Sequence, residues 1–398
     1  MTIDQTISEN NLSVSEPSEK HLLDGMNILL ISRHFPPINT GGSRRSILIV
    51  EALESAGANV CVAAPLAGHN DNIITVSHPQ PEPSIDQSKQ KSRTPLKVLI
   101  KDFIRRNFLL PDPDIRWTRR VVKAVNASGR SFDWVVTTSP PESIHYAGYR
   151  LSHKTDTKWL ADMRDFWLEN SLYKPRKNPI RAKIDRLIAR KWLSEANEVI
   201  AVSESITKEA ETLSQRHGIV ISQMTKLTQS TLDFLLEKEK IHIAHTGSFS
   251  LSDSGRHIET CLNLFSEALA RNPKLHLHLA GRLTVDEIKK INSHPARHHI
   301  TNHGLLEYDS ALALQKQMHA LVVFSAADSL AIPGKFYEYK RAGRPVFGVG
   351  GPALTKLTGD DALEGLSNLT LKKIQKNVQG YDVMQAGQDI ATLMLAAR

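Results

Sequence analysis

Two charged side chains three residues apart, Lys335 and Glu338, form the pair in this sequence that is best suited to chemistry. Pro333 before them and Gly343 after them suit the start and the end of a short helix, which places both charges on one helix face. Free N–H groups at the helix start, with Lys335 beside them, favour an anion such as a diphosphate. The Glu338 carboxylate can accept two hydrogen bonds from vicinal hydroxyls, such as those of a ribose. The segment therefore predicts adjacent sites for a diphosphate and a sugar.

The same segment, standing alone, would be a capped surface helix with a local Lys–Glu pair. Residues 333–345, however, carry Pro-Gly-Lys, then Glu-Tyr, then Ala-Gly-Arg-Pro. This pattern resembles the donor-binding helix of family-4-like glycosyltransferases of the GT-B fold. The resemblance covers residues 26–354, and it implies that Gly334, Lys335 and Glu338 bind a nucleotide-diphosphate sugar.

Apolar runs of strand length alternate with helix-like segments along most of the chain, which predicts parallel sheets with helices on both faces. The expected strands are residues 26–31, 59–64, 134–138, 158–163, 198–202, 241–245, 275–280, 300–303, 320–324 and 346–349. The expected helices are residues 43–55, 179–196, 256–270, 285–292 and 310–318. This pattern indicates an α/β protein with two doubly wound Rossmann-like domains. The resemblance implies the GT-B arrangement, in which the domains face each other across a cleft at the carboxyl ends of their strands.

The domain boundaries follow from these elements and from composition. Residues 1–25 are polar and predict a disordered tail, and residues 26–205 form the expected N-terminal, acceptor-side domain. Residues 206–240 are the expected linker, and residues 241–375 the expected nucleotide-sugar-binding domain. Residues 376–398 predict a C-terminal helix that could pack back on the N-terminal domain.

Composition narrows the class of protein. With 398 residues, 40% of them hydrophobic and 23% charged, the chain suits two ordinary soluble domains. Its two cysteines, Cys61 and Cys261, lie among apolar residues and suggest neither a disulfide framework nor a zinc site. No signal peptide is visible, and no apolar run approaches the roughly 18 residues that span a bilayer. We therefore expect a cytoplasmic protein.

The net charge of +8 is concentrated in residues 89–130 and 174–191. Such segments attract anionic surfaces of phospholipid, polyphosphate or nucleic acid. Nucleic acid is not an expected partner, because no aromatic interleaving or known reading motif accompanies the charge. Residues 95–110 predict a basic amphipathic helix that could rest on an anionic membrane. The alternative is an ordinary helix packed on the N-terminal domain, and a lipid-linked acceptor follows only from the membrane interpretation.

The first strand is followed by a loop that contains Gly41 and Gly42, with Arg45 shortly after them. Glycines at this edge of a sheet let the backbone approach a ligand, and the helix start behind them can meet a phosphate. The G-x-G-x-x-G fingerprint of dinucleotide-binding proteins is absent. The loop resembles the "PP…GG" loop of the same glycosyltransferases, which implies that it borders the acceptor and the transferred sugar. A plain strand-to-helix turn is the alternative.

The strand at 158–163 leads into Asp162, Arg164 and Asp165, which should point into the cleft. This segment resembles a "D-x-R-D-x-W" segment of the family, so that Asp162 or Asp165 could orient a hydroxyl and Arg164 could hold a phosphate. A buried Asp–Arg pair that ties strand to loop is the alternative for Asp162 and Arg164. His145 follows a Ser-Pro-Pro turn, for which residues 139–142 predict a capping box. It could face the cleft, although a lone histidine is more often structural.

Several residues of the second half are assigned to the donor site because they follow its strands. The resemblance implies that the first of them lie near the diphosphate and the others line the base pocket. These residues are Gly247, Ser248, Arg256, Gly281, Arg282, Gly304 and Leu305. The family usually has a glutamate eight residues before the second one, but Leu330 stands there. The usual Asn-Gly-x-Asp turn between the domains is also missing, and residues 229–233 replace it.

The predicted reaction is transfer of a sugar from a nucleotide-diphosphate sugar to a hydroxyl acceptor, without a cofactor. Lys335 and Arg256 would meet the charge of the leaving group, which is electrostatic catalysis, and Asp165 would serve the acceptor. The resemblance implies a retaining, metal-independent reaction. Asp112-Pro113-Asp114 predicts a turn and no metal site. A sugar-nucleotide epimerase of the same fold and a non-catalytic binding protein with a decayed donor site remain as alternatives.

Overall fold

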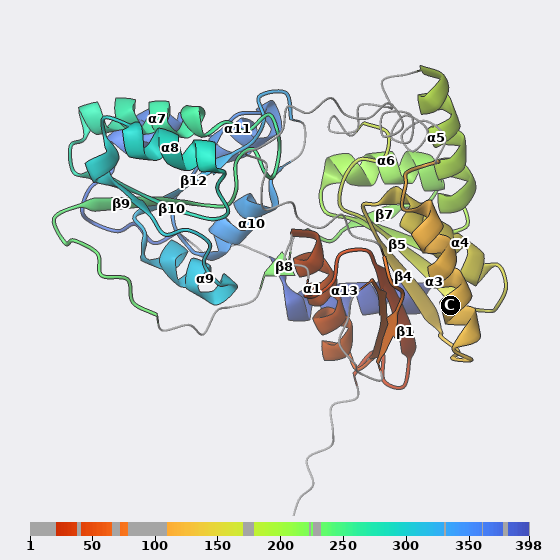
Figure 1. Ribbon diagram of the computed structural model, residues 1–398. Helices are drawn as coiled ribbons and strands as arrows, with labels where there is room; N and C mark the ends of the chain where they lie inside the picture. Colours follow the sequence, from red (N-terminus) through yellow and green to blue (C-terminus); the bar gives the residue numbers. More distant parts are fainter. Residues whose placement is uncertain are drawn as a thin grey trace, which may run out of the picture.

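In the computed structural model, the described residues are 21–37, 41–65, 72–78, 110–169, 179–222, 224–225, 232–329, 332–359, 361–376 and 381–397. Within these ranges the chain forms two parallel sheets, of seven and five strands, with helices on both faces of each (Figure 1). The predicted α/β class with two Rossmann-like domains is therefore confirmed.

The first sheet belongs to the N-terminal domain, and all of its strand pairs are parallel. In spatial order its strands are β3 (Ile73–Thr75), β2 (Asn59–Ala64), β1 (Asn27–Ser32), β4 (Trp134–Ser139), β5 (Lys158–Met163), β6 (Glu198–Ala201) and β7 (Gly218–Val220). The predicted ranges for β2 and β5 agree residue for residue. The sheet continues beyond residue 205, where we expected the first domain to end, because β7 pairs with β6.

Both faces of this sheet are buried, so its strands are continuous apolar runs. Leu29 and Ile31 of β1 point into one hydrophobic cluster, and Ile28 and Leu30 point into another. The helices on the first face are α3 (Ile115–Ala127), α4 (His145–Ser152), α5 (Pro179–Leu193) and α6 (Glu204–Ser214). The helices on the second face are α1 (Gly41–Ser55) and α13 (Val383–Ala396).

The second sheet belongs to the C-terminal domain and is also parallel. In spatial order its strands are β11 (Ile300–Asn302), β10 (Leu275–Ala280), β9 (Ile241–Thr246), β12 (Ala320–Phe324) and β13 (Val346–Val349). The helices that contribute to the cluster on one face are α7 (Ile258–Arg271), α8 (Val285–Ser293) and α12 (Ala362–Ser367). Those that contribute on the other face are α9 (Tyr308–Gln317), α10 (Gly334–Arg341) and α11 (Pro352–Thr358).

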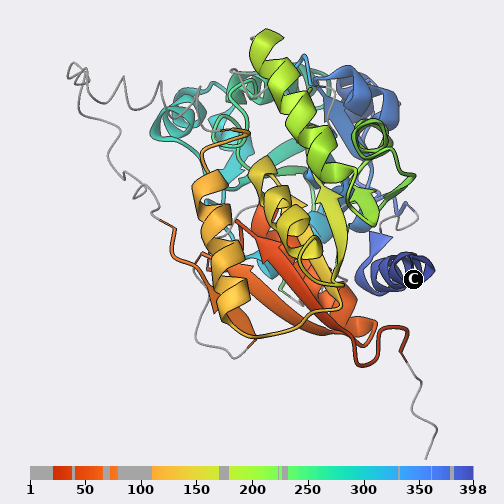
Figure 2. The same ribbon diagram turned by 90° about the vertical axis from the view of Figure 1, so that its right-hand side faces the viewer.

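The chain returns to the N-terminal domain at its end. A parallel ribbon of β8 (Met224–Thr225) and β14 (Tyr381–Asp382) leads into α13, which packs on α1 (Figures 1 and 2). Gly387 permits this close approach, because a Cβ there would lie 2.3 Å from the carbonyl oxygen of Ala52. The fold therefore joins the last helix of the chain to the helix that follows the first strand.

Two local predictions need correction. The predicted tail of residues 1–25 is too long, because Leu23 is fully buried and its N–H donates to the Ala56 carbonyl at 2.8 Å. Residues 1–20 lie outside the described part of the chain. The predicted capping box at 139–142 does not form: a 3₁₀ turn begins at Glu142, and Ser139 instead ends β4 and donates its hydroxyl to the Asp162 carbonyl.

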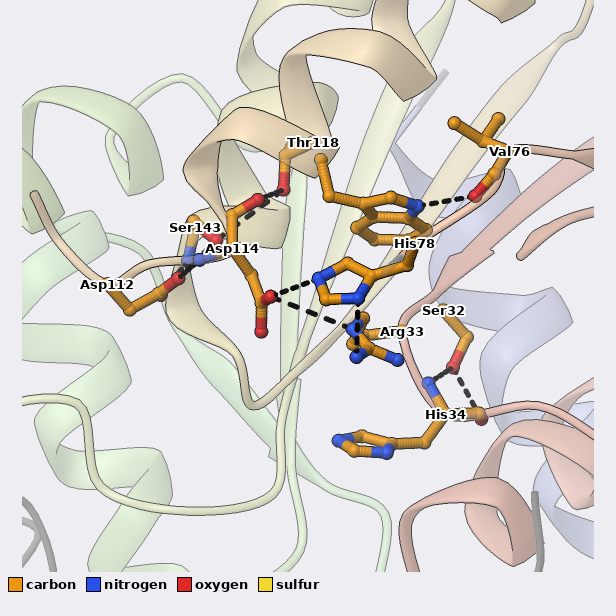
Figure 3. A network of polar contacts seen from close by, with 10 residues as sticks. Ser32, Arg33, His34, Val76, His78, Asp112, Asp114, Thr118 and Ser143 are labelled. Carbon is orange, nitrogen blue, oxygen red and sulfur yellow. Dashed lines mark hydrogen bonds and ion pairs between the residues drawn. The ribbon is translucent and has the colours of Figure 1, made fainter. Parts of the chain in front are cut away.

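The Asp112–Asp114 segment is a turn into α3, as expected, and it anchors a polar network (Figure 3). Asp112 accepts hydrogen bonds from the N–H and the hydroxyl of Ser143, both at 2.7 Å. Asp114 accepts from His78 at 2.7 Å, and the other ring nitrogen of His78 lies 3.1 Å from the Arg33 guanidinium. Burial, followed by the charge of Glu142, raises the pKa of Asp112 to about 7. This network fixes the start of α3 against the loop after β1.

A chain of three imidazoles lies on one face of the C-terminal sheet. His242 Nε2 faces the Glu237 carbonyl at 2.8 Å, so it carries the proton and donates. His242 Nδ1 then accepts from His278 Nε2 at 2.9 Å, and His278 Nδ1 accepts from His303 Nε2 at 2.9 Å. His242 and His278, each of which accepts through Nδ1, must therefore be neutral. Burial lowers the pKa of His278 to about 3 and that of neighbouring His276 to about 4.

We expect acid to destabilise the protein through these rings. Their pKa values in the folded protein lie below the ordinary 6.5, so the unfolded chain binds protons that the folded chain excludes. The stabilisation is complete above pH 6.5 and is lost as the pH falls toward 4. Asp112 acts with the opposite sign, because its pKa is raised on folding. Other carboxylates with a raised pKa, such as Glu209, act in the same direction as Asp112. More of the large shifts belong to histidines, and they include that of buried His145, whose pKa is about 3.

Urea unfolding at about pH 7.5 and about pH 5 measures this effect. The midpoint should fall at the lower pH in the wild type, and the fall should be smaller in His278→Gln, which can donate and accept without titrating. A midpoint that is equal at both pH values in the wild type would contradict the expectation.

Candidate functional site

A cavity of about 610 Å³ lies between the carboxyl edges of the two sheets and is lined by both domains. The predicted cleft is therefore present. The N-terminal domain contributes Gly42, Arg44, Arg164, Asp165 and Val202. The C-terminal domain contributes, among others, His245, Gly247, Ser248, Arg256, Gly281, Arg282, Leu305, Tyr308, Gly334, Lys335 and Glu338.

Helix α10 places Lys335 and Glu338 in this cavity, as the spacing predicted. Pro333 is its N-cap residue, and Gly343 after its end has φ +67°. Tyr339 on the buried side of α10 ties the helix to the end of β9, because its hydroxyl accepts from the Thr246 N–H at 2.6 Å. Pro333, Gly334 and Lys335 at the start of α10 line the cavity, so the free N–H groups of the first turn lie at this edge.

Glu338 is buried, and its carboxylate accepts hydrogen bonds from three charged or polar side chains. Its Oε1 accepts from Lys335 Nζ and Gln315 Nε2, both at 2.6 Å, and its Oε2 accepts from Arg44 Nη1 at 2.6 Å. Burial by itself would raise the pKa of Glu338, but the charges of Lys335 and Arg44 outweigh it and lower the pKa. The carboxylate therefore stays ionised and acts as an acceptor.

The cationic side chains of Lys335 and Arg256 line the cavity. Burial lowers the pKa of Lys335, although the Glu338 carboxylate opposes that effect. Arg256 has a buried Nε–H from which no described group accepts a hydrogen bond, and the Asp253 carboxylate lies 3.9 Å from this nitrogen. Burial lowers the pKa of Arg256 as well. A guanidinium with unused donors beside a lysine is suited to hold an anion such as a diphosphate.

Glycines at the ends of β9 and β10 bring two loops together at this edge. The Gly247 N–H donates to the Ala280 carbonyl at 2.7 Å, and the Gly281 N–H donates to the Gly304 carbonyl at 2.7 Å. A Cβ at residue 281 would lie 2.2 Å from the Gly247 carbonyl oxygen, and φ there is +151°. Only glycine fits that position.

We expect Gly281→Ala to push the 247–248 loop out of place. Ligand binding in the cavity should weaken by at least about tenfold, because a shift of about 1 Å in a positioning loop can have such an effect. Gly359→Ala is the matched control, since Gly359 in the same domain has φ +74° but open space around its Cβ position and does not line the cavity. Binding that is equal in both variants and in the wild type would contradict this prediction.

His245 is a cavity residue that the sequence analysis named only as part of a strand. The residue is 3% exposed, and its Nδ1 faces the Val322 carbonyl at 3.0 Å, so the proton lies on Nδ1. No described donor reaches Nε2, which is left as an acceptor. Burial, with the charges of Lys335 and Arg256, lowers the pKa of His245 to about 4. The only sequence signal was a histidine at the end of a strand, directly before a glycine loop.

On the N-terminal side, the structure brings Gly42, Arg164 and Asp165 to the cavity. A Cβ at Gly42 would lie 2.5 Å from the Arg164 guanidinium. Arg164 is held in place by the Ser139 and Pro140 carbonyls, at 2.7 and 3.0 Å. Asp165 lines the cavity and is exposed to solvent. Gly41 begins α1.

Arg45 and Asp162 do not reach the cavity. Both side chains are fully buried, and Arg45 Nη2 donates to Asp162 Oδ1 at 2.6 Å. Arg45 also donates to the Ser222 carbonyl, and Asp162 also accepts from Thr138 at 2.6 Å. The alternative of a buried Asp–Arg pair therefore applies to Asp162, with Arg45 rather than Arg164 as its partner. The pair ties α1 to β5.

His145 also lies away from the cavity. It is fully buried, its Nδ1 is 2.8 Å from the Thr137 hydroxyl, and its ring stacks on Trp167 at 5.7 Å. Burial lowers its pKa to about 3, so it is a neutral residue of the core. Leu330 and residues 229–231 lie outside the described part of the chain.

Two further observations concern metals and membranes. Among the described residues, no group of three or more histidine, cysteine, aspartate or glutamate side chains could hold a metal ion. No helix in the same part of the chain is both long and apolar enough to cross a membrane.

The architecture of this protein is similar to that of several solved structures. The chain is similar to sucrose-phosphate synthase from Thermosynechococcus elongatus, with 16% identity, a TM-score of 0.55 and 94% of each chain covered. It is similar to the lipopolysaccharide outer core galactosyltransferase WaaB, with 11% identity, a TM-score of 0.53, and 94% of this chain and 100% of that chain covered. It is also similar to UDP-GlcNAc 2-epimerase from Neisseria meningitidis, with 12% identity, a TM-score of 0.52, and 93% and 100% covered.

These similarities show that the chain has the GT-B fold. No protein-family model matches the sequence, and no curated protein matches it.

Proposed function

We propose that this protein is a glycosyltransferase that moves a sugar, of the hexosyl type, from a nucleotide-diphosphate sugar to a hydroxyl acceptor. The observation that carries the proposal is the arrangement in one cavity of Lys335, Arg256 and the start of α10 beside the buried Glu338 carboxylate. The cations and helix N–H groups suit a diphosphate, and the carboxylate suits ribose hydroxyls. Solved glycosyltransferases among the similar structures support the same class.

Catalysis in this proposal is electrostatic. Lys335, Arg256 and the N–H groups of α10 stabilise the charge that develops on the departing diphosphate. The glycine loops at Gly247 and Gly281 bring backbone groups to the donor, and Ser248, Arg282, Gly304 and Leu305 complete its site. Asp165 and Arg164, across the cleft, orient the acceptor. The proposed reaction is retaining and needs neither metal nor cofactor.

An assay of nucleotide release tests this proposal. The protein is incubated with UDP-, GDP- and ADP-sugars and a set of acceptors, which includes simple glycosides and lipid-phosphate-linked sugars. Free nucleoside diphosphate together with a new glycoside supports transfer. An epimerised nucleotide sugar without a glycoside would instead establish the alternative that the similar epimerase structure favours. A folded protein that turns over no nucleotide sugar would favour a non-catalytic binding protein.

We also propose that the enzyme acts in the cytoplasm on an anionic membrane surface, with a glycolipid or polysaccharide precursor as acceptor. Residues 95–109 of the predicted amphipathic segment lie outside the described residues. Helix α5 supports the proposal independently, because its exposed face carries Ile180, Ile184 and Leu187, which are 72%, 37% and 59% exposed at helical spacing. Lys183 and Arg186 flank them.

Vesicle pelleting tests the membrane proposal. The protein should pellet with vesicles of phosphatidylcholine and phosphatidylglycerol, less with phosphatidylcholine alone, and less at high salt. Replacing Ile180, Ile184 and Leu187 by serine should abolish pelleting, whereas Val285→Ser, at an exposed residue of the other domain, should not. Absence of pelleting at low salt would refute the proposal.

A further inference from the structure

Arg44 reaches from the N-terminal domain into the C-terminal domain. It lies in the first turns of α1, and its Nη1 is 2.6 Å from Glu338 Oε2. Its guanidinium also lies 3.6 Å from the centre of the Tyr308 ring, at the start of α9. The next residue, Arg45, is anchored in the core by Asp162. Arg44 is therefore presented by a firmly held helix, and we call this contact the Arg44–Glu338 bridge.

The three donors to Glu338 differ in where they come from. Lys335 and Gln315, which share Oε1, belong to the same domain as Glu338. Arg44, which occupies Oε2, belongs to the opposite domain. A pair of vicinal hydroxyls needs acceptor positions on this carboxylate. The position on Oε2 is filled by a side chain of the opposite domain. A nucleotide can therefore reach Glu338 by displacing Arg44 while Lys335 and Gln315 stay in place.

We propose that Arg44 competes with the ribose of a nucleoside diphosphate for Glu338, so that donor binding breaks the Arg44–Glu338 bridge and loosens the contact between the two domains. The inference rests on the proposed function, because it takes Glu338 as the ribose ligand. Arg44 is a positioning residue in this account: it acts through Glu338 and sets how tightly the donor binds and how far the cleft is closed before binding.

The Arg44–Glu338 bridge affects both the affinity for the nucleotide and the contact between the two domains. It holds a buried carboxylate against a cation, and the donor must give Glu338 equivalent hydrogen bonds before the exchange is favourable. Removing Arg44 removes the competitor, so nucleotide affinity should rise. It also removes a link across the cleft, so the protein without nucleotide should become more extended.

The test combines calorimetry with solution scattering on the full chain. Binding of UDP, GDP and ADP is titrated to the wild type, Arg44→Ala and Arg44→Gln, and the radius of gyration of each protein is measured without nucleotide. Arg341→Ala is the matched control, because Arg341 also forms an ion pair, at 2.6 Å with Asp382, but does not line the cavity. Thermal unfolding verifies that each variant is folded.

We expect both Arg44 variants to bind the nucleotide about tenfold more tightly than the wild type, a change of about 1.4 kcal/mol, and to have a larger radius of gyration. Arg341→Ala should match the wild type in affinity. Weaker or unchanged binding in the Arg44 variants overturns the inference, since Arg44 would then contact the nucleotide or be irrelevant to it. If no nucleotide binds to any of the proteins, the proposed function fails. In that case an unchanged radius of gyration separately shows that Arg44 does not hold the domains together.

Discussion

Replacing Arg45 by alanine is expected to lower the free energy of unfolding by about 3–5 kcal/mol, the effect of breaking a buried ion pair by removing one partner. The Asp162 carboxylate is fully buried, and among the described residues it would keep only the hydroxyl of Thr138 as a side-chain donor. The Ser222 carbonyl would also lose its contact with Arg45. Urea unfolding at neutral pH measures the change.

The double variant Arg45→Met with Asp162→Leu is the informative comparison. Removing both charges leaves no unpaired carboxylate, so the double variant should be more stable than Arg45→Ala. A cost below about 1 kcal/mol for Arg45→Ala would contradict the structural role, because exposed ion pairs contribute that little. Arg45 would then be free to act in the cleft, as its position beside the Gly41-Gly42 loop first suggested.

Lys335→Ala is expected to reduce kcat for sugar transfer by about 10²–10³-fold, the effect of removing one preorganised group that stabilises developing charge. The ammonium lies at the start of α10, 2.6 Å from Glu338, in the cavity that contains Arg256. It is thus placed to meet the departing diphosphate. Lys340→Ala is the control, because Lys340 is on the same helix but lies over Phe336, away from the cavity.

Steady-state kinetics with the nucleotide sugar that the wild type turns over distinguish the outcomes. A fall in kcat confined to Lys335→Ala supports a role in the transition state. A rise in KM with kcat unchanged would mean that Lys335 only binds the donor. Equal activity of Lys335→Ala and the wild type would refute the assignment.

The strands of this protein are predictable because parallel strands buried on both faces are uninterrupted apolar runs. β2, β5, β10, β12 and β13 begin and end where the sequence placed them. Helix α3 was not predicted, although Trp117 and Val121 have helical spacing. Its four basic residues lie in a strongly charged segment, and such a segment is typical of a charged surface as much as of a packed helix. The packing of α13 on α1 joins segments more than 300 residues apart. The sequence predicted a C-terminal helix that could return to the N-terminal domain, but no local pattern indicated α1 as the helix on which it packs.

The candidate site was predictable where a loop glycine or a helix start marks the sheet edge, as for Gly247, Gly281 and Lys335. The sequence did not predict which of two neighbouring residues of one helix enters the site. Arg44 and Arg45 are adjacent, and successive residues point about 100° apart on a helix. Only the packing of α1 decides that Arg45 enters the core and Arg44 enters the cleft.

The most direct test of the central claim is a thermal-shift measurement against UDP-, GDP- and ADP-sugars and their free diphosphates, on the wild type and Glu338→Ala. Each shift is taken relative to the same protein without ligand. The account predicts a selective upward shift with one nucleotide in the wild type and its loss in Glu338→Ala, since binding to the folded state raises stability. No shift with any nucleotide, or an equal shift in the variant, would contradict the claim that this cleft binds a nucleotide sugar through Glu338.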